Sequence, residues 1–134
     1  MHFNIEKSIC LTTGELCQHQ FVMRGYVNKG DGRYFGVCTV IERGNGLWEP
    51  TAWQVNPPTN KKGLEVRPPN DYAIQGTKFL MSLGYRVSGT FELHRLKAYK
   101  RMFRGFFTLV LIKNIDKTYN GKVLHFAYVE FKEI

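Results

Sequence analysis

Short runs of β-branched and aromatic residues, each closed by a glycine-containing turn, recur along the chain and favour a β-sheet protein. The first three runs are residues 21–27, 34–43 and 47–55. Asn28-Lys29-Gly30-Asp31-Gly32 separates the first two, and Gly44-Asn45-Gly46 separates the second from the third. Consecutive strands joined by such turns predict an antiparallel meander. Pro50 cannot donate a ladder hydrogen bond, so the third strand is expected to begin at an edge or a bulge.

One helix and three further strands are expected downstream. The helix is predicted over 72–83, with Asp71 as its N-cap and Gly84 as its stop. Residues 86–99 alternate between apolar and polar side chains at their start, which is typical of a half-buried strand. The last two strands are predicted over 107–112 and 123–131.

This order of elements predicts a mostly β fold of the OB type. An OB-fold is a five-stranded Greek-key barrel, and here one short helix would lie between strands 3 and 4. The extra C-terminal strand would pair at an edge or mediate self-association. Other small barrels and sandwiches fit the same order.

The length of 134 residues fits a single domain over 1–134. Within it we expect four parts: an N-terminal extension over 1–19, the OB-like barrel over 20–115, an exposed proline-rich loop over 56–70 and a C-terminal hairpin strand over 119–134. The proline-rich loop is equally compatible with a functional loop and with a tolerated insertion.

Several features bear on location and redox state. The longest apolar run, 106–112, is too short to span a membrane, and residues 1–7 do not resemble a secretory signal. We therefore expect a cytoplasmic protein with no membrane partner. Three cysteines form an odd set, so free thiols are expected, with Cys38 in the core.

Positive charge is the strongest functional signal. The sequence has 19 Lys and Arg against 11 Asp and Glu, a net charge of +8, and such an excess attracts polyanions. Five of these cations and three aromatic residues lie in a predicted hairpin from His94 to Phe106: Arg95, Lys97, Lys100, Arg101 and Arg104, with Tyr99, Phe103 and Phe106. Cations neutralise phosphates and aromatic rings stack on unpaired bases. The alternative is a solvated hairpin whose cations protect its edge and whose phenylalanines belong to the core.

A second basic and aromatic group surrounds the first hairpin. It consists of Arg24, Tyr26, Arg33, Tyr34 and Phe35. One of Trp48 and Trp53 is expected in the core, whereas an exposed one would provide a stacking platform.

Four segments together resemble the bacterial-type single-stranded-DNA-binding proteins: 24–27, 37–40, 51–55 with its tryptophan, and 84–92. The resemblance spans about residues 20–115. It implies an OB-fold, a DNA path along Trp53, Phe91 and the basic hairpin, and a homo-oligomer, either a dimer or a tetramer. The chain departs from that family in its proline-rich loop and in its ending, a strand over 129–134 where the family has an acidic tail that recruits DNA-replication partners. These departures favour a phage or mobile-element relative.

Enzyme and metal signals are weak. Cys10, Cys17 and His19 could supply three metal ligands, but a fourth is missing and the spacing is not that of a zinc site. No Ser-His-Asp or Cys-His arrangement is present in the sequence, and a nuclease whose carboxylates converge only in three dimensions stays open. We therefore predict a protein without catalysis, cofactor or metal that binds single-stranded nucleic acid, with DNA as the first choice. The alternative is a small phage or secretion-type assembly protein whose basic hairpin binds an acidic protein partner.

Overall fold

The computed structural model describes residues 1–27, 33–57, 59, 61–64 and 70–134. Its elements, in chain order, are β1 (His2–Ile9), β2 (Leu16–Tyr26), β3 (Gly36–Gly44), β4 (Leu47–Val55), α1 (Asp71–Ser82), β5 (Arg86–Glu92), a 3-10 turn (Leu93–Arg95), α2 (Leu96–Phe103), β6 (Phe107–Tyr119) and β7 (Lys122–Glu133).

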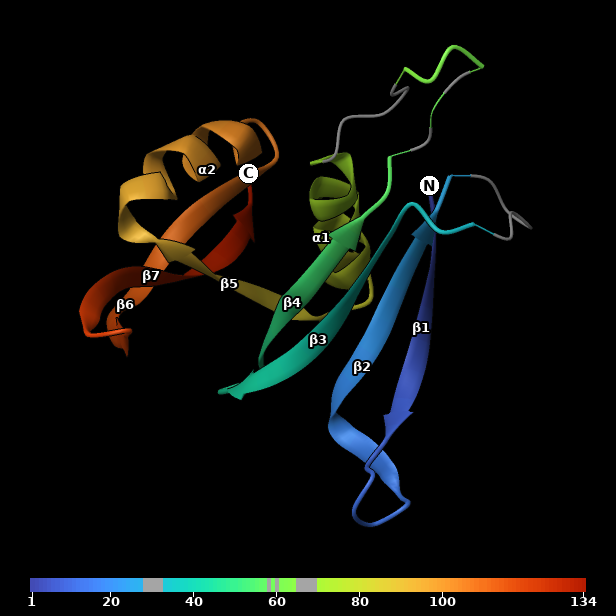
Figure 1. The fold of residues 1–134 in the computed structure, drawn as a ribbon, viewed down its shortest axis with the longest axis horizontal. Coiled ribbons are helices and arrows are strands. Elements are labelled where there is room, and N and C mark those ends of the chain that lie inside the picture. The colour runs from blue at the N-terminus through green and yellow to red at the C-terminus, as the bar shows by residue number, and fades with distance from the viewer. Residues whose placement is uncertain (28–32, 58, 60, 65–69) are drawn as a thin grey trace.

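The strands form one seven-stranded mixed sheet in the order β1-β2-β3-β4-β5-β7-β6 (Figure 1). Every neighbouring pair is antiparallel except β4 and β5, which are parallel. A parallel pair needs a crossover connection, and α1 lies in the connection between these two strands. The sheet therefore consists of two antiparallel halves, β1-β2-β3-β4 and β5-β7-β6, which are joined through the pairing of β4 with β5.

Both helices pack against the same face of the sheet. Leu80 of α1 and Phe103 of α2 belong to one cluster of buried side chains, together with strand residues such as Val40, Val87 and Val129. Side chains on a strand point alternately to its two faces, so the neighbours of these strand residues point the other way. That second face, here called the open face, includes the polar side chains Thr39, Arg43, Glu49, Ser88, Thr90 and Glu130.

The predicted OB barrel is wrong. The structure has an open seven-stranded sheet with β1 and β6 at its edges, whereas a barrel would be closed. Residues 1–19 contain β1 and the start of β2. The sequence order of strands and helix resembled an OB-fold because strand order does not encode the parallel pairing of β4 and β5.

The predicted hairpin from His94 to Phe106 is also wrong, because most of this segment forms the 3-10 turn and α2. Leu96, Tyr99 and Phe103 recur at helical spacing and pack on the core. The cations between them form the solvated side of an amphipathic helix, and Lys100 and Arg101 lie in its last turn, where the helix dipole favours positive charge.

The strand expected over 47–55 is confirmed as β4 with the same bounds, and those expected over 34–43 and 123–131 are confirmed as β3 and β7 with ends shifted by one or two residues. The predicted helix is confirmed as α1, but its N-cap is Asn70, and Asp71 is the first helical residue. The predicted turn at 28–32 lies outside the described residues, as does much of the proline-rich loop.

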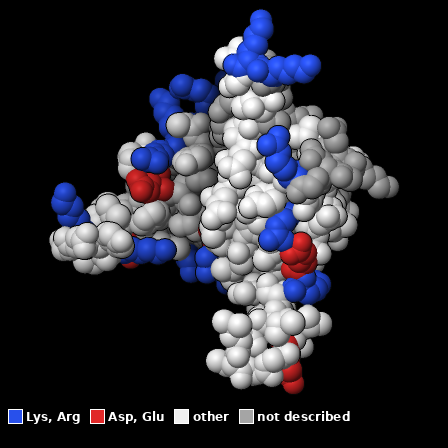
Figure 2. All heavy atoms as spheres, turned by 45° about the vertical axis from the view of Figure 1, so that its right-hand side comes forward, with Lys and Arg blue, Asp and Glu red and all other residues white. Residues whose placement is uncertain are grey.

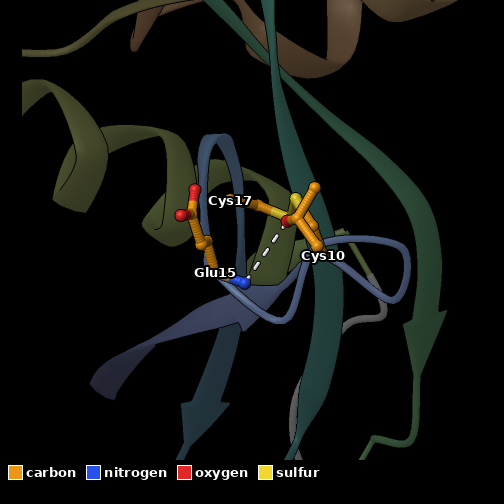
Figure 3. The surroundings of a disulfide bond; sticks show 4 residues. Cys10, Glu15 and Cys17 are labelled. Atoms are coloured by element: carbon orange, nitrogen blue, oxygen red, sulfur yellow. Dashed lines mark hydrogen bonds between the residues drawn. A yellow bond between two sulfur atoms is a disulfide. The ribbon is translucent and has the colours of Figure 1, made fainter.

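Two of the cysteines are not free thiols. Cys10 and Cys17 form a disulfide across the tip of the β1–β2 hairpin (Figure 3). Beside it, the backbone N–H of Glu15 donates to Thr13 Oγ1 at 3.3 Å. Cys38 is free and buried, as expected. Within the described residues, no helix is both long enough and apolar enough to cross a membrane.

Candidate functional site

The parallel strands β4 and β5 separate soon after they meet. Their only paired residues are Leu47 with Arg86 and Trp48 with Val87. Beyond these pairs the two strands leave each other in different directions (Figure 1). The facing backbone groups of Glu49 to Val55 and of Ser88 to Phe91 therefore have no partner in the opposite strand.

A bulge increases this separation on β4. Thr39 pairs with Thr51 but Val37 pairs with Gln54, so β4 contains one residue more than β3 over this stretch. Ala52 has a φ of 52°, in the left-handed region, which costs energy for any residue with a Cβ. Bulges bend a strand and often occur beside active sites.

A cleft of about 420 Å³ fills the space where the strands diverge, within the usual size range of small-molecule sites. Four elements contribute most of its walls, with Trp53 and Val55 from β4 and Phe91 from β5. Tyr99, Met102 and Phe103 from α2 close one side, and Asn70, Ala73 and Thr77 from α1 close the other. The cleft is thus largely apolar, with free strand edges at its base.

The N-terminus of α1 lies at this cleft, because both the N-cap Asn70 and Ala73 of the first turn line it. The first N–H groups of a helix and its dipole favour a negatively charged group at this end. The cleft therefore has the N-terminus of α1 at one end and an apolar middle.

A second, smaller cleft of about 210 Å³ lies on the open face. It is lined by Arg43, Glu49, Thr90, Lys113, Ile115, Lys117 and Tyr128. Glu49 and Thr90 also line the larger cleft. The two clefts therefore approach each other from opposite faces of the sheet at the point where β4 and β5 separate.

Glu49 is the carboxylate that both clefts share. Its side chain is 8% exposed, and its Oε1 accepts a hydrogen bond from Arg43 Nε at 2.9 Å. A buried carboxylate needs such a partner. Next to it on the open face, Tyr128 Oη donates to Ser88 Oγ at 2.8 Å.

Behind the Trp53 wall of the larger cleft lies a buried polar pair, Tyr72 and Cys38. Trp53 packs edge-on against Tyr72, with ring centroids 5.3 Å apart. Tyr72 is fully buried, and its hydroxyl donates to the carbonyl of Met23 at 2.8 Å and contacts Cys38 Sγ at 3.4 Å. Burial raises the pKa of the Cys38 thiol to about 11, although the bond from Tyr72 lowers it. Burial, followed by the charge of Cys38, raises the pKa of Tyr72 as well.

The residues predicted on the basic hairpin divide into two sets. The cations are exposed on the 3-10 turn and the outer side of α2: Arg95, Lys97, Lys100, Arg101 and Arg104. Two of the three aromatic residues turn inward, since Phe103 is buried and Tyr99 packs on Phe91 with ring centroids 4.5 Å apart, whereas Phe106, beyond the end of α2, is 38% exposed. The cations and the rings of Tyr99 and Phe103 thus lie on different sides of the helix and do not share one exposed face.

The predicted group at the first hairpin is not joined to α2. Arg24 forms an ion pair with Glu6 and lies over the ring of Tyr34, 5.7 Å from its centroid. Tyr26 ends β2, and Arg33 is exposed. On the face shown in Figure 2, Lys and Arg are dispersed and large areas carry no charge.

The two tryptophans differ as expected. Trp48 packs against Phe21 and Tyr85, whereas Trp53 is 40% exposed. The indole N–H of Trp53 donates to the carbonyl of Pro50 at 3.2 Å. Trp53 lies in the wall of the larger cleft.

Four of the predicted residues therefore line the larger cleft: Trp53, Phe91, Tyr99 and Phe103. The sequence analysis did not single out Glu49, Thr90 and Asn70, or the two lysines of the smaller cleft, Lys113 and Lys117. The available signal was a strand, a helix and a strand in succession over 47–92, which fits a parallel crossover unit as well as a barrel. Within the described residues, no group of three or more His, Cys, Asp or Glu side chains could hold a metal ion.

Known proteins resemble this chain in structure but not in sequence. No protein-family model matches the sequence, and no curated protein matches it. Among solved structures, NAA60 of Arabidopsis thaliana in complex with a bisubstrate analogue has a TM-score of 0.48 at 14% identity, covering 84% of this chain and 75% of that one. NAA60 in complex with acetyl-CoA has a TM-score of 0.47 at 15% identity, covering 86% and 77%.

The predicted relation to single-stranded-DNA-binding proteins is wrong, as are the predictions of a non-catalytic nucleic-acid binder and of an assembly protein that binds an acidic partner. The physical reason lies in α2. The features taken for a binding hairpin are a helix whose cations face solvent and whose aromatic residues support the core and the cleft.

Proposed function

We propose that this protein transfers an acyl group from a coenzyme A thioester to an amine. The observation that supports this is the pair of clefts that approach each other between β4 and β5 and share Glu49 and Thr90. Group transfer needs a donor and an acceptor held together in one orientation. Two clefts on opposite faces of a sheet allow each substrate to enter without blocking the other.

The larger cleft suits coenzyme A from one end to the other. The pyrophosphate of coenzyme A matches the N-terminus of α1, where Asn70 and Ala73 line the cleft. Its pantetheine arm is a narrow chain with two amides, which can bond to the free strand edges of β4 and β5. The apolar walls formed by Phe91 and Met102 accommodate the methylene groups of the arm.

The reaction would take place where the clefts meet. The amine nitrogen attacks the thioester carbonyl, the carbon–sulfur bond breaks, and the amine loses a proton. Glu49 lines both clefts and is the group we assign to accept that proton. Tyr99 is the phenol in the wall of the larger cleft, and we assign it to donate a proton to the departing thiolate.

Binding is tested first, by titrating the protein with acetyl-CoA in a calorimeter. Acetyl-CoA is the compound bound to one of the two NAA60 structures, so it is the first thioester to try. The substitution Ala73→Asp places a negative charge in the first turn of α1, where it favours the helix but repels a phosphate. We expect at least tenfold weaker binding by a variant that still melts cooperatively. Gln75→Asp makes the same charge change at a position that does not line the cleft, and it should bind like the wild type.

Transfer is tested by the release of free thiol from acetyl-CoA in the presence of amines. Glu49→Gln should lower kcat at least a hundredfold while the affinity for acetyl-CoA stays within about threefold. Absence of acetyl-CoA binding at millimolar concentration, or equal binding by Ala73→Asp and the wild type, would refute the proposed function.

A further inference from the structure

The smaller cleft on the open face has an unequal charge distribution. Three of its lining residues are cations, Arg43, Lys113 and Lys117, and one is an acid, Glu49. Arg43 is already paired with Glu49. Two positive charges therefore remain without compensation in the wall of a small cavity.

The strand register explains why both lysines face this cleft. Lys113 pairs with Tyr128 and Lys117 pairs with Leu124 in the β6–β7 ladder. A shift in register between Leu111 and Lys113 changes the alternation of β6, so that Lys113, Ile115 and Lys117 all point to the open face.

Aromatic side chains hold the two ammonium groups in place. Lys113 Nζ lies 5.9 Å from the centroid of the Tyr128 ring, and Lys117 Nζ lies 5.3 Å from that of Phe126. Such contacts attract a cation without neutralising it. In the described part of the chain, neither lysine forms an ion pair with a carboxylate.

The nearby acids are already engaged elsewhere. Glu130 on the same face pairs with Arg86 and Lys132. Asp116 pairs with His125, and both alternate with the residues that face the cleft, so they point to the other side of the sheet. The two lysines are therefore available to a ligand.

We infer that the acceptor amine carries an anionic group, a carboxylate or a phosphate, a few bonds away from its nitrogen. This inference rests on the proposed function, because it assigns the acceptor to the smaller cleft. The amine lies toward Glu49, at the junction with the larger cleft, and the anion lies toward Lys113 and Lys117. A volume of about 210 Å³ is below the range typical of drug-sized ligands, so a molecule the size of an amino acid fits and a long chain does not.

The test compares amines that differ only in the anion. Tyramine is compared with tyrosine for a carboxylate, and ethanolamine with phosphoethanolamine for a phosphate, each with acetyl-CoA as donor. The anionic member of at least one pair should have a kcat/KM at least tenfold higher. The pair that shows the difference identifies which anion the site prefers.

Charge variants locate the effect. Lys113→Gln combined with Lys117→Gln should remove the preference for the anionic amine, mainly by raising the KM of that amine at least tenfold more than the KM of the neutral amine. Lys122→Gln makes the same kind of change at the start of β7, away from the cleft, and should keep the preference. Equal kcat/KM for both members of both pairs, or a preference that survives in the double variant, would overturn the inference.

A binding measurement separates this inference from the proposed function. Titration of the anionic amines by NMR, without acetyl-CoA, should shift backbone signals of Thr90 and Tyr128 in the wild type but not in the double lysine variant. If acetyl-CoA does not bind but these shifts occur, the anion site stands and acyl transfer is refuted. If acetyl-CoA binds and is consumed but the shifts do not occur, the anion site is refuted and acyl transfer stands.

Discussion

Replacing Tyr72 with phenylalanine tests the support beneath the cleft wall. The substitution removes one oxygen from a fully buried side chain and leaves the ring against Trp53 and Phe35. The lost hydroxyl donates to the Met23 carbonyl at 2.8 Å. A typical hydrogen bond contributes about 0.5–1.5 kcal/mol net, and burial of an unsatisfied partner adds to the loss. We expect the free energy of unfolding to fall by about 1–2 kcal/mol.

Urea denaturation followed by tryptophan fluorescence measures this change. The slope against urea should stay constant, because the surface exposed on unfolding is the same. In a thermal melt the midpoint should fall by about 3–6 °C for a chain of this length. Tyr119→Phe removes the same atom from a side chain that is 69% exposed, and it should change stability by less than about 0.5 kcal/mol.

A loss below about 0.3 kcal/mol in Tyr72→Phe would refute this reasoning. It would mean that the hydroxyl makes no net contribution in the folded state. A loss as large as that of a core cavity, about 3 kcal/mol or more, would mean instead that the ring moves when the hydroxyl is removed.

Four other variants test the fold and its titrating groups. Gly36→Ala places a Cβ 2.6 Å from the buried ring of Tyr72. The variant should lower the free energy of unfolding in urea by about 1–3 kcal/mol, and unchanged stability would contradict this packing. Cys10→Ser combined with Cys17→Ser opens a loop with a sequence separation of 7, which should cost roughly 2 kcal/mol by calorimetry, whereas unchanged stability under oxidising conditions would mean that the disulfide does not form. The pKa of Glu130 is lowered mainly by its hydrogen bond from Arg86. The folded protein is therefore stabilised above the unfolded pKa of about 4.3, and this stabilisation is lost as the pH falls through the lower folded pKa. Glu130→Gln should flatten the fall in stability at acid pH, measured by urea titration, and identical pH profiles for the variant and the wild type would refute the contribution of Glu130. The pKa of the Cys38 thiol is about 11 in the folded state and about 8.5 in the unfolded state. The free energy of unfolding should therefore fall as the pH rises from about 8.5 to about 11, and it should fall less in Cys38→Ala.

The local elements were largely readable from the sequence. Runs such as 34–43 and 47–55 became strands because period-two patterns and glycine turns act over a few residues. The helix over 71–82 was readable for the same reason. In contrast, 96–103 has too few residues to show clearly whether its rings or its cations face the core, and it was interpreted as a hairpin.

The candidate site could be predicted only in part. Trp53, Phe91, Tyr99 and Phe103 were singled out because they are aromatic, and they do meet at one cleft. They meet for a different reason from the one the sequence indicated, because the helix turns them inward and the cations outward. Glu49 carried no signal, since a single acid in a strand is ordinary until a second strand diverges from it.

The sequence by itself determined where β2 to β7 and the first helix form, that the chain carries a large positive charge, and that Cys38 is buried; it did not predict β1. Only the tertiary structure decided that β4 and β5 run parallel, that they separate after Trp48 and Val87, and that Cys10 and Cys17 meet. The physical reason is the distance along the chain over which each interaction acts. Side-chain alternation is set by neighbours along the chain, whereas the pairing of distant strands, the bulge at Ala52 and the clefts beside it depend on which surfaces find each other when the core closes.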